Sequence, residues 1–342
     1  MAVTIKDVAR KAGVSPSTVS RVISNHPRIS PETSRRVKEI MKQLGYHSNI
    51  MARSLVSNKT FTLGMILPRP AEELFQNHFF AENIRGITTQ ASRNGYDVLM
   101  TAGHSEHGEL EAVTRLVKGK RVDGIILLQS RKDDPIIAFL KKEDFPFILI
   151  GNYGDNDILC VDNDNVQASY DATMHLISQG HHRIGFVSGP PNLTVSRDRL
   201  EGYKKALTDN GIRLETEWVM EGEFLQESGY RAMSFFMNLP DRPTALVVID
   251  DIVTFGILRG LSELGYKVPD DLSLVSFNNI YLAELSSPPL SSIDIGIYQL
   301  GYMASQLLTR RIQGEKPQQL RTIVPHRLVV RESSLNIKRN WS

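Results

Sequence analysis

The feature that most constrains the fold is a regular alternation of short apolar runs and amphipathic segments after residue 61. The apolar runs have the length of β-strands and lie at 62–68, 96–102, 122–129, 145–151, 182–189, 244–250 and 272–279. Segments with helical spacing of apolar residues lie between most of them, at 81–94, 109–118, 165–179, 197–210, 228–238 and 253–264. Strands that are apolar along their whole length are buried on both faces, as in parallel sheets covered by helices. The pattern is too long for one doubly wound sheet, so it predicts an α/β body with two lobes.

The first 60 residues lack this alternation and instead predict three short amphipathic helices. Thr4 and Asp7 form a capping-box pattern before the first helix. Ser15–Pro16 and Ser30–Pro31 each combine an N-cap hydroxyl with proline at the first helical position. About three residues separate the first two helices, which is the spacing of a helix-turn-helix.

Charge separates the same N-terminal segment from the rest of the chain. Residues 1–60 contain eleven Lys or Arg and three Asp or Glu, a net charge of +8, although the whole chain carries only +2. The remaining residues contain 29 basic and 35 acidic side chains. A basic head on a mildly acidic body predicts a polyanionic partner for the head.

Several other classes of protein are excluded by what the sequence lacks. No apolar run approaches the ~18 residues of a membrane span, and the N-terminus has no apolar signal region. Cys160 is the only cysteine, so no internal disulfide can form and a reducing cytoplasm is expected. Glycine-rich phosphate loops, a nucleophile elbow and the His and Cys spacing of metal sites do not occur. We therefore expect no cofactor, no metal, no membrane association and no catalysis.

The stretch GVSPSTVSRVISNH, residues 13–26, corresponds to the second helix of the predicted helix-turn-helix. Val19, Val22 and Ile23 fall on its inward side. Its outward side carries small hydroxyls and a single arginine, Arg21. Hydroxyls at a helix N-terminus can bond to phosphate, and an arginine can donate twice to one guanine. An ordinary solvated helix would have a similar face, but the caps, the spacing and the +8 charge favour DNA binding.

Residues 4–25, TIKDVARKAGVSPSTVSRVISN, and 29–55, ISPETSRRVKEIMKQLGYHSNIMARSL, resemble the DNA-binding head of the LacI/GalR family of bacterial transcription regulators. Later segments follow that family's order, among them VDGIILL, GHHRIGFVSGP, RLEGYKKAL, PTALVVIDD and VPDDLSLVSFNN. The resemblance implies a helix-turn-helix head at 1–47, a hinge helix and linker at 48–60, and a two-lobed sensor at 61–342 similar to periplasmic sugar-binding proteins. Its lobes would comprise 61–161 with 293–322, and 162–292 with 323–340.

The resemblance also implies which residues contact DNA. The base-reading positions are Pro16, Ser17 and Arg21. The phosphate-contacting positions are Ser15, Thr18, Ser20, Ser24, Ser30 and Thr33. The hinge positions in the minor groove are Asn49, Ala52, Arg53 and Leu55, although Leu55 alone would be an ordinary exposed leucine. Because proline offers a base only apolar contact, we expect Arg21 to supply most of the hydrogen-bonded readout.

Ligands of two-lobed α/β folds bind between the lobes, near the carboxyl ends of strands. Phe79, Phe80, Arg199 and Phe224 match effector positions of relatives. Arg197 lies two residues before Arg199, and Asp250 and Asn278 lie at the ends of predicted strands, so we expect these three to contact the effector as well. The three phenylalanines could equally be core residues, and Asp162 and Asp164 could cap the next helix instead of touching a ligand. Many relatives have aspartate in place of Asn278; an amide donates as well as accepts, so the bonding pattern for hydroxyls is altered.

These features together predict a sequence-specific DNA-binding regulator, most simply a repressor of carbohydrate utilisation genes. The FNN and NHFF segments resemble maltose-type regulators, which implies maltose or a maltodextrin as effector; another sugar, a sugar phosphate or a purine is the alternative. A sugar receptor for transport would suit the body but not the DNA head, and an enzyme would need a catalytic motif. The tail after Arg331 has no heptad repeat, so we expect a homodimer on a palindromic operator and not a tetramer.

Overall fold

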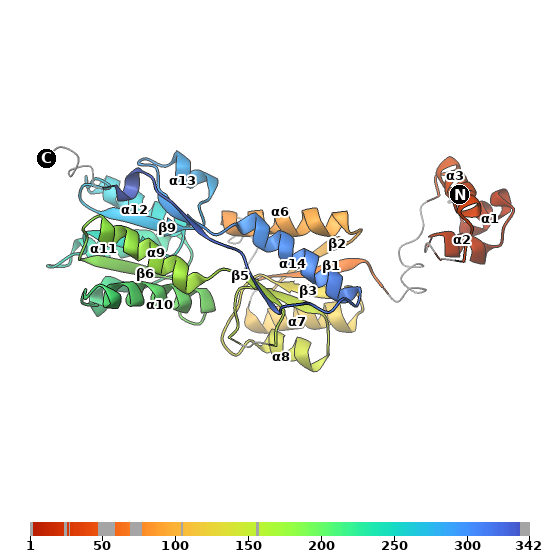
Figure 1. The fold of residues 1–342 in the computed structure, drawn as a ribbon, viewed down its shortest axis with the longest axis horizontal. Helices are drawn as coiled ribbons and strands as arrows, with labels where there is room; N and C mark the ends of the chain where they lie inside the picture. The colour runs from red at the N-terminus through yellow and green to blue at the C-terminus, as the bar shows by residue number, and fades with distance from the viewer. Residues whose placement is uncertain are drawn as a thin grey trace. The chain divides into compact units, whose positions relative to one another are not determined.

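The chain folds into two compact units, which comprise residues 1–61 with 120–123 and residues 62–119 with 124–342. The computed structural model describes residues 3–23, 26, 28–46, 59–68, 77–103, 105–154 and 157–335. The described residues of the first unit form three helices, and those of the second form two sheets covered by helices (Figure 1). Among the described residues, no helix combines the length and the apolar character that crossing a membrane requires.

The small unit is a three-helix bundle, as the helical spacing predicted. Its helices are α1 (Ile5–Ala12), α2 (Pro16–Ile23) and α3 (Pro31–Leu44). Its core consists of Val8, Ala9, Ala12, Val19, Val22 and Val37. Only residues 13–15 separate α1 from α2, so the two form the predicted helix-turn-helix.

The helix ends in this unit are set by local side chains. Ser15 Oγ accepts a hydrogen bond from the Thr18 amide at 3.1 Å, and Ser30 Oγ accepts one from the Thr33 amide at 3.3 Å. The capping box before α1 is also present. Gly13 ends α1 with φ 65°, a left-handed conformation that glycine adopts without steric cost. Each serine satisfies an amide that would otherwise lack a partner in the first helical turn.

The large unit has two six-stranded sheets. The first has the order β11-β5-β4-β3-β1-β2 and is parallel throughout. Its strands are β1 (Thr62–Leu67), β2 (Asp97–Ala102), β3 (Gly124–Leu127), β4 (Phe147–Ile150), β5 (Cys160–Asp162) and β11 (Arg321–Ile323). The second has the order β12-β10-β9-β8-β6-β7, with only β12 antiparallel to its neighbour. Its strands are β6 (Ile184–Ser188), β7 (Val219–Glu221), β8 (Ala245–Val248), β9 (Ser273–Phe277), β10 (Ser291–Asp294) and β12 (Arg327–Val329). The predicted two-lobed α/β fold is confirmed.

Helices cover the sheets of both lobes. Those of the first lobe are α6 (His78–Arg93), α7 (Glu106–Lys118), α8 (Pro135–Lys142) and α14 (Ile297–Ile312). Those of the second are α9 (Asn165–Ser178), α10 (Thr194–Asp209), α11 (Gln226–Met237), α12 (Asp251–Glu263) and the short α13 (Tyr281–Leu285). Two 3-10 turns, η1 (Thr216–Trp218) and η2 (Glu332–Ser334), complete the second lobe. All four residues of β3, β4 and β8 are buried, which accounts for the continuous apolar runs that predicted them.

The chain passes from one lobe to the other at positions slightly different from the predicted boundaries. Asp162 ends β5 in the first sheet, and Asp294 ends β10 in the second. The lobe limits therefore lie one or two residues from those expected. Strand β10 could not be predicted from an apolar run, because two of its buried residues are serines. The hydroxyls of Ser291 and Ser292 donate hydrogen bonds to the Arg331 carbonyl and to Asp251, respectively.

Three crossovers join the lobes, after β5, after β10 and after β11. Asn163 lies in the first of them and is 3% exposed. Its Nδ2 donates to the carbonyl of Ile295 at 2.9 Å and to the carbonyl of Val324 at 2.8 Å, which lie in the other two crossovers. One side-chain amide thus joins all three connections.

Helices α6 and α14 lie side by side over the first sheet (Figure 1), and their backbones touch. A Cβ added to Gly86 of α6 would lie 2.2 Å from the Tyr298 carbonyl oxygen of α14. We therefore expect Gly86→Ala to lower the free energy of unfolding by about 2 kcal/mol, because backbone cannot yield as a flexible side chain would. Urea denaturation would measure this, with Ser92→Ala on the exposed side of α6 as the control, expected to change stability by less than about 0.5 kcal/mol. Equal stability of both variants would contradict the backbone contact.

Candidate functional site: a DNA-binding helix and a pocket between two lobes

Helix α2 divides its residues between the core and solvent as a DNA-reading helix requires. Val19 and Val22 are 0% and 1% exposed and hold the helix to the bundle. Pro16, Ser17 and Arg21 are exposed. The three residues expected to read bases therefore lie on the accessible surface of one helix, which is the arrangement that entry into a major groove needs.

The candidate phosphate ligands gather at two helix N-termini. Ser15 and Thr18 lie at the start of α2 with their hydroxyls 2.9 Å apart, and Ser30 and Thr33 at the start of α3 with the same separation. Helix N-termini favour anions because their amide groups and the helix dipole both point outward. Ser20 is half-buried on α2. Ser24 and the hinge positions Asn49, Ala52, Arg53 and Leu55 lie outside the described residues.

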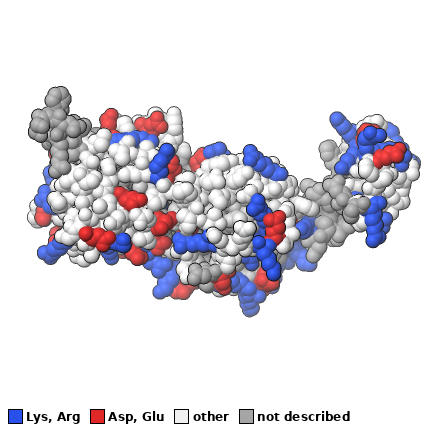
Figure 2. All heavy atoms as spheres, viewed as in Figure 1, with Lys and Arg blue, Asp and Glu red and all other residues white. Residues whose placement is uncertain are grey.

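Lys and Arg side chains stand out on the face of the three-helix unit that Figure 2 shows, among uncharged and a few acidic residues. The exposed ones are Lys6, Arg10, Lys11, Arg21, Arg28, Arg35, Arg36, Lys38 and Lys42. Such a surface attracts a polyanion irrespective of its sequence.

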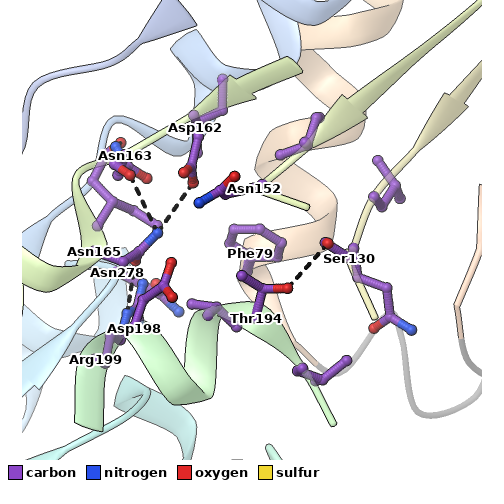
Figure 3. A pocket seen from close by; sticks show the side chains of 18 of the residues that line it. Phe79, Ser130, Asn152, Asp162, Asn163, Asn165, Thr194, Asp198, Arg199 and Asn278 are labelled. Atoms are coloured by element: carbon purple, nitrogen blue, oxygen red, sulfur yellow. Dashed lines mark hydrogen bonds between the residues drawn. The ribbon is translucent and has the colours of Figure 1, made fainter. Parts of the chain in front are cut away.

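A cavity of about 810 Å³, its open mouth included, lies between the two lobes of the large unit. Its apolar wall is formed by Phe79, Phe80, Leu128, Ile150, Leu193, Val195, Phe224, Ile295 and Leu300. Its polar wall is formed by Asn77, Gln129, Ser130, Asn152, Asp162, Asn163, Asn165, Thr194, Asp198, Arg199, Asp250 and Asn278 (Figure 3). Most of the polar residues follow directly after a strand or start a helix, so the two sheets aim their carboxyl ends at one cleft.

Asp250 is the centre of a hydrogen-bond network that crosses the cleft. Its Oδ2 accepts from Asn278 Nδ2 at 2.7 Å and from Asn77 Nδ2 of the first lobe at 3.2 Å. Its Oδ1 caps α12 by accepting from the Ile252 amide at 2.7 Å. Asn278 has φ 97°, a conformation in which asparagine and aspartate are less disfavoured than most residues. The amide of Asn278 therefore serves as a donor to the neighbouring carboxylate, which a second aspartate could not do while ionised.

A second contact between the lobes lies at Ser130 and Thr194. Their hydroxyls are 3.1 Å apart, and the Thr194 amide donates to the Ser130 carbonyl at 3.2 Å (Figure 3). Both residues line the cavity. A ligand in the cavity would therefore lie among the groups that hold the lobes together.

Arg199 is buried in the second lobe with its charge directed at the cavity wall. Its Nε donates to Asn165 Oδ1 at 3.0 Å, its Nη1 donates to the Ile249 carbonyl at 2.7 Å, and its guanidinium lies 4.0 Å from the centre of the Phe277 ring. Burial lowers the pKa of Arg199 to about 10, against the opposing effect of the Asp250 charge. The arginine remains protonated at neutral pH and is held in one orientation.

Asp251, behind the cavity wall, is also fully buried. It accepts hydrogen bonds from the Ile280 amide and the Ser292 hydroxyl, both at 2.8 Å. Burial, together with the neighbouring charge of Asp250, raises the pKa of Asp251 to about 7. Asp251 thereby ties α12 to β10 and to the segment that carries Asn278.

The structure brings together six of the seven predicted effector residues: Phe79, Phe80, Arg199, Phe224, Asp250 and Asn278 all line the cavity. The prediction for Arg197 is wrong, because this residue is exposed and does not line the cavity. Residues two apart on a helix point to nearly opposite sides, so Arg197 must face away when Arg199 faces inward. Of the two aspartates left open, Asp162 lines the cavity, whereas Asp164 caps α9 by accepting from the Gln167 amide at 2.9 Å.

Several cavity residues were missed in the sequence. Ser130, Asn152 and Thr194 belong to segments that no motif marks. Asn77 begins the NHFF segment, but only the two phenylalanines of that segment were predicted, and Asp198 lies between two arginines that were predicted instead. Ser130 and Asn152 could have been found, because each directly follows a predicted strand, 122–129 and 145–151 respectively. Asn77 lies beside residues 69–76, outside the described part of the chain, and no strand pattern leads to it.

Replacing Arg197 by glutamine should leave effector binding within about twofold of wild type, because Arg197 is exposed, its hydrogen bond to Thr194 Oγ1 is long at 3.4 Å, and surface charges contribute little. Isothermal titration of the purified protein with sugars would measure this. A loss of tenfold or more would show that Arg197 enters the cavity after all.

Comparison with known proteins agrees with both parts of the structure. A family model of bacterial regulatory proteins of the lacI family matches residues 4–49, and one of periplasmic binding protein-like domains matches residues 173–334. The HTH-type transcriptional regulator MalR of Streptococcus pneumoniae is 37% identical over 336 residues, covering 96% of this chain and 99% of MalR.

Two solved structures resemble the whole chain. The transcriptional regulator CelR in complex with cellobiose is 31% identical with a TM-score of 0.76, covering 97% of this chain and 99% of CelR. The lac repressor dimer bound to operator and an anti-inducer is 26% identical with a TM-score of 0.85, covering 98% of this chain and all of that one.

A DNA-binding three-helix head and a two-lobed ligand-binding domain define a ligand-controlled transcriptional regulator. The chain belongs to the LacI family of bacterial regulatory proteins.

Proposed function

We propose that this regulator represses genes of carbohydrate utilisation in the cytoplasm, binds a near-palindromic operator as a homodimer, and responds to maltose or a maltodextrin. The observation that carries the proposal is the cavity between the lobes, which combines phenylalanine rings with side-chain amides and carboxylates. Sugar rings pack their C–H faces on aromatic side chains, while each hydroxyl needs a donor or acceptor when it leaves water.

Two relatives support a disaccharide as the effector. One is a probable maltose operon transcriptional repressor of known structure, 28% identical to this chain with a TM-score of 0.75, and the other is CelR, which was solved with cellobiose. Phe79 and Phe224 line the cavity here, and Asn152 and Asp198 are among the polar groups of the same lining. We infer that a sugar packs on the phenylalanines and bonds to these polar groups.

DNA recognition is assigned to α2 and to the residues that follow the bundle. Pro16, Ser17 and Arg21 would contact bases, and the hydroxyls of Ser15, Thr18, Ser20, Ser24, Ser30 and Thr33 would contact phosphates. The hinge residues Asn49, Ala52, Arg53 and Leu55 would enter the minor groove, where an apolar wedge is offset by the contacts that a bent duplex permits.

Regulation follows from the contacts that cross the cleft. Asn77 reaches Asp250, and Ser130 reaches Thr194, across the space that the sugar would fill. A ligand that bonds differently to the two lobes in their two orientations shifts the population between them. The coupled change in operator affinity is the regulatory output.

Operator selection from a random duplex library, followed by fluorescence anisotropy with and without sugars, tests this proposal. We expect near-palindromic sites to bind at least about 10³-fold tighter than random duplex at moderate salt. Log affinity should fall with log salt by about 0.9 for each phosphate neutralised. Maltose or maltotriose should change operator affinity, whereas cellobiose, glucose 6-phosphate and guanine should not. Equal binding of selected and random duplexes would refute the DNA-binding proposal, and a response to guanine alone would refute the sugar.

A further inference from the structure

Asp198 is the one carboxylate of the cavity wall that the rest of the wall leaves uncompensated. It lies on α10 directly before Arg199, lines the cavity, and is half-buried. Its carboxylate extends from the helix toward the open space in Figure 3. Within the described part of the chain, Asp198 forms no hydrogen bond and no ion pair, although it is surrounded by residues that do.

The other charged groups of the wall are matched. Asp162 pairs with Arg321 at 2.9 Å and also accepts from Asn165. Asp250 accepts three hydrogen bonds, and its charge is offset by that of the buried Arg199. The neighbouring Arg197 is exposed, and its Nη2 donates to Thr194 Oγ1 at 3.4 Å and not to Asp198, although its charge opposes the rise in the pKa of Asp198. Among the described residues, no side chain or backbone group donates a hydrogen bond to Asp198, so a ligand in the cavity can supply that donor.

We propose that Asp198 sets the charge selectivity of the cavity: it accepts hydrogen bonds from hydroxyl groups of an uncharged carbohydrate and repels anionic ligands such as sugar acids and sugar phosphates. The inference rests on the proposed function in one respect, namely that the cavity holds a sugar. An ionised carboxylate can only accept, and sugar hydroxyls are donors that match it. A ligand carboxylate or phosphate in the same place would bring two like charges together in a partly buried site.

The surroundings of Asp198 indicate when its charge is present. Burial, together with the neighbouring charge of Asp162, raises the pKa of Asp198 to about 6, against the opposing effect of the Arg197 charge. The other charged groups around it are Arg321 of β11, and Arg197 and Glu201 of its own helix. At pH 7.5 the carboxyl is mainly ionised, and at pH 5 it is mainly protonated. Rejection of anions should therefore weaken as the pH falls through about 6.

The test compares two ligands that differ in a single group. Maltitol and maltobionate share their sugar and their open-chain end, which is an alcohol in the first and a carboxylate in the second. Isothermal titration at pH 7.5 on the full-length protein should show maltitol binding on the order of 100-fold more tightly than maltobionate, as expected for a like charge at about 5 Å in a site of intermediate dielectric constant.

Asp198→Asn is the decisive variant, because asparagine keeps the shape and removes the charge. We expect the ratio of the two affinities to fall to less than about fivefold, with maltobionate gaining and maltitol losing affinity. Glu201→Gln removes the same charge from the exposed side of the same helix and should leave the ratio as in wild type. Lowering the pH to 5 should reduce the wild-type ratio and leave the Asp198→Asn ratio unchanged, since maltobionate remains ionised.

Three results would overturn the inference: equal binding of both ligands to wild type, an unchanged ratio in Asp198→Asn, or no binding of maltose, maltitol and maltobionate at all. The proposed function fails separately. Sugar binding with the expected charge selectivity but without any effect on operator affinity would refute sugar control of transcription and leave the role of Asp198 intact.

Discussion

Arg21→Ala should abolish most of the discrimination between the operator and its single-base variants. A bidentate contact between arginine and a base contributes about 1–3 kcal/mol, and a dimer makes it twice, so about 2–6 kcal/mol of operator binding should be lost. Anisotropy titrations on a set of operators substituted at each position would show the largest change at one base pair in each half-site. Binding to random duplex should weaken much less, because the other basic residues of the head remain.

Pro16→Ala is the matched variant on the same exposed face of α2. Proline lacks an amide donor and has an apolar side chain, so its replacement should change affinity by less than about 1 kcal/mol per subunit and leave the preferred sequence intact. The core residues Val19 and Val22 are untouched by either change. Similar losses of discrimination in both variants would contradict the division of roles between Arg21 and Pro16.

Asn278→Asp should destabilise the large unit and weaken sugar binding at neutral pH. The new carboxylate would stand where an amide now donates to Asp250 at 2.7 Å. The like charges and the lost hydrogen bond should cost about 3 kcal/mol at pH 8, measured by urea denaturation. The left-handed backbone at this position suits aspartate as well as asparagine, so the effect is one of charge and not of backbone strain.

The pH dependence of this variant identifies the cause. Two adjacent carboxylates share a proton in the folded state, so their folded pKa is raised above the unfolded value. The folded state then binds more protons than the unfolded state, and stability falls as the pH rises. The deficit relative to wild type should be largest at pH 8 and should shrink at pH 5. The exchanged pair Asp250→Asn with Asn278→Asp restores one donor and one acceptor and should recover most of the stability; a constant deficit at all pH values would refute the charge pair.

The fold could be predicted wherever local sequence and burial agree. The caps Ser15 and Ser30 act within one helical turn, so the head helices begin where the sequence places them. Strands β3 and β8 are buried on both faces, so each could be predicted from an uninterrupted apolar run in the sequence. Strand β10 could not, because Ser292 is buried through a hydrogen bond to Asp251, forty-one residues earlier in the chain. Such a partner is visible only after the chain has folded.

The candidate site shows the same limit. Arg199, Asp250 and Asn278 could be placed in the cavity because they follow strands or match a family pattern. The hydrogen bond between Asn278 and Asp250 could not be predicted, although it explains why an amide suits position 278. The orientation of Arg197 could have been derived from helical periodicity once Arg199 was placed inside. Asn77 contacts Asp250 across 173 residues, and nothing in the sequence connects the two.

Asn163 determines what kind of motion the two lobes can make. Because its amide holds the carbonyls of Ile295 and Val324, three separate stretches of chain pass through one fixed point. Such a pivot favours rotation of the lobes over sliding once the contacts across the cleft, Asn77–Asp250 and Ser130–Thr194, have opened. The connection therefore acts as the fulcrum of a lever, and Asn163 also lines the cavity, next to the place where the sugar would lie. A small shift of the backbone beside Asn163 would therefore rotate one lobe against the other, and the displacement of an atom would grow in proportion to its distance from Asn163.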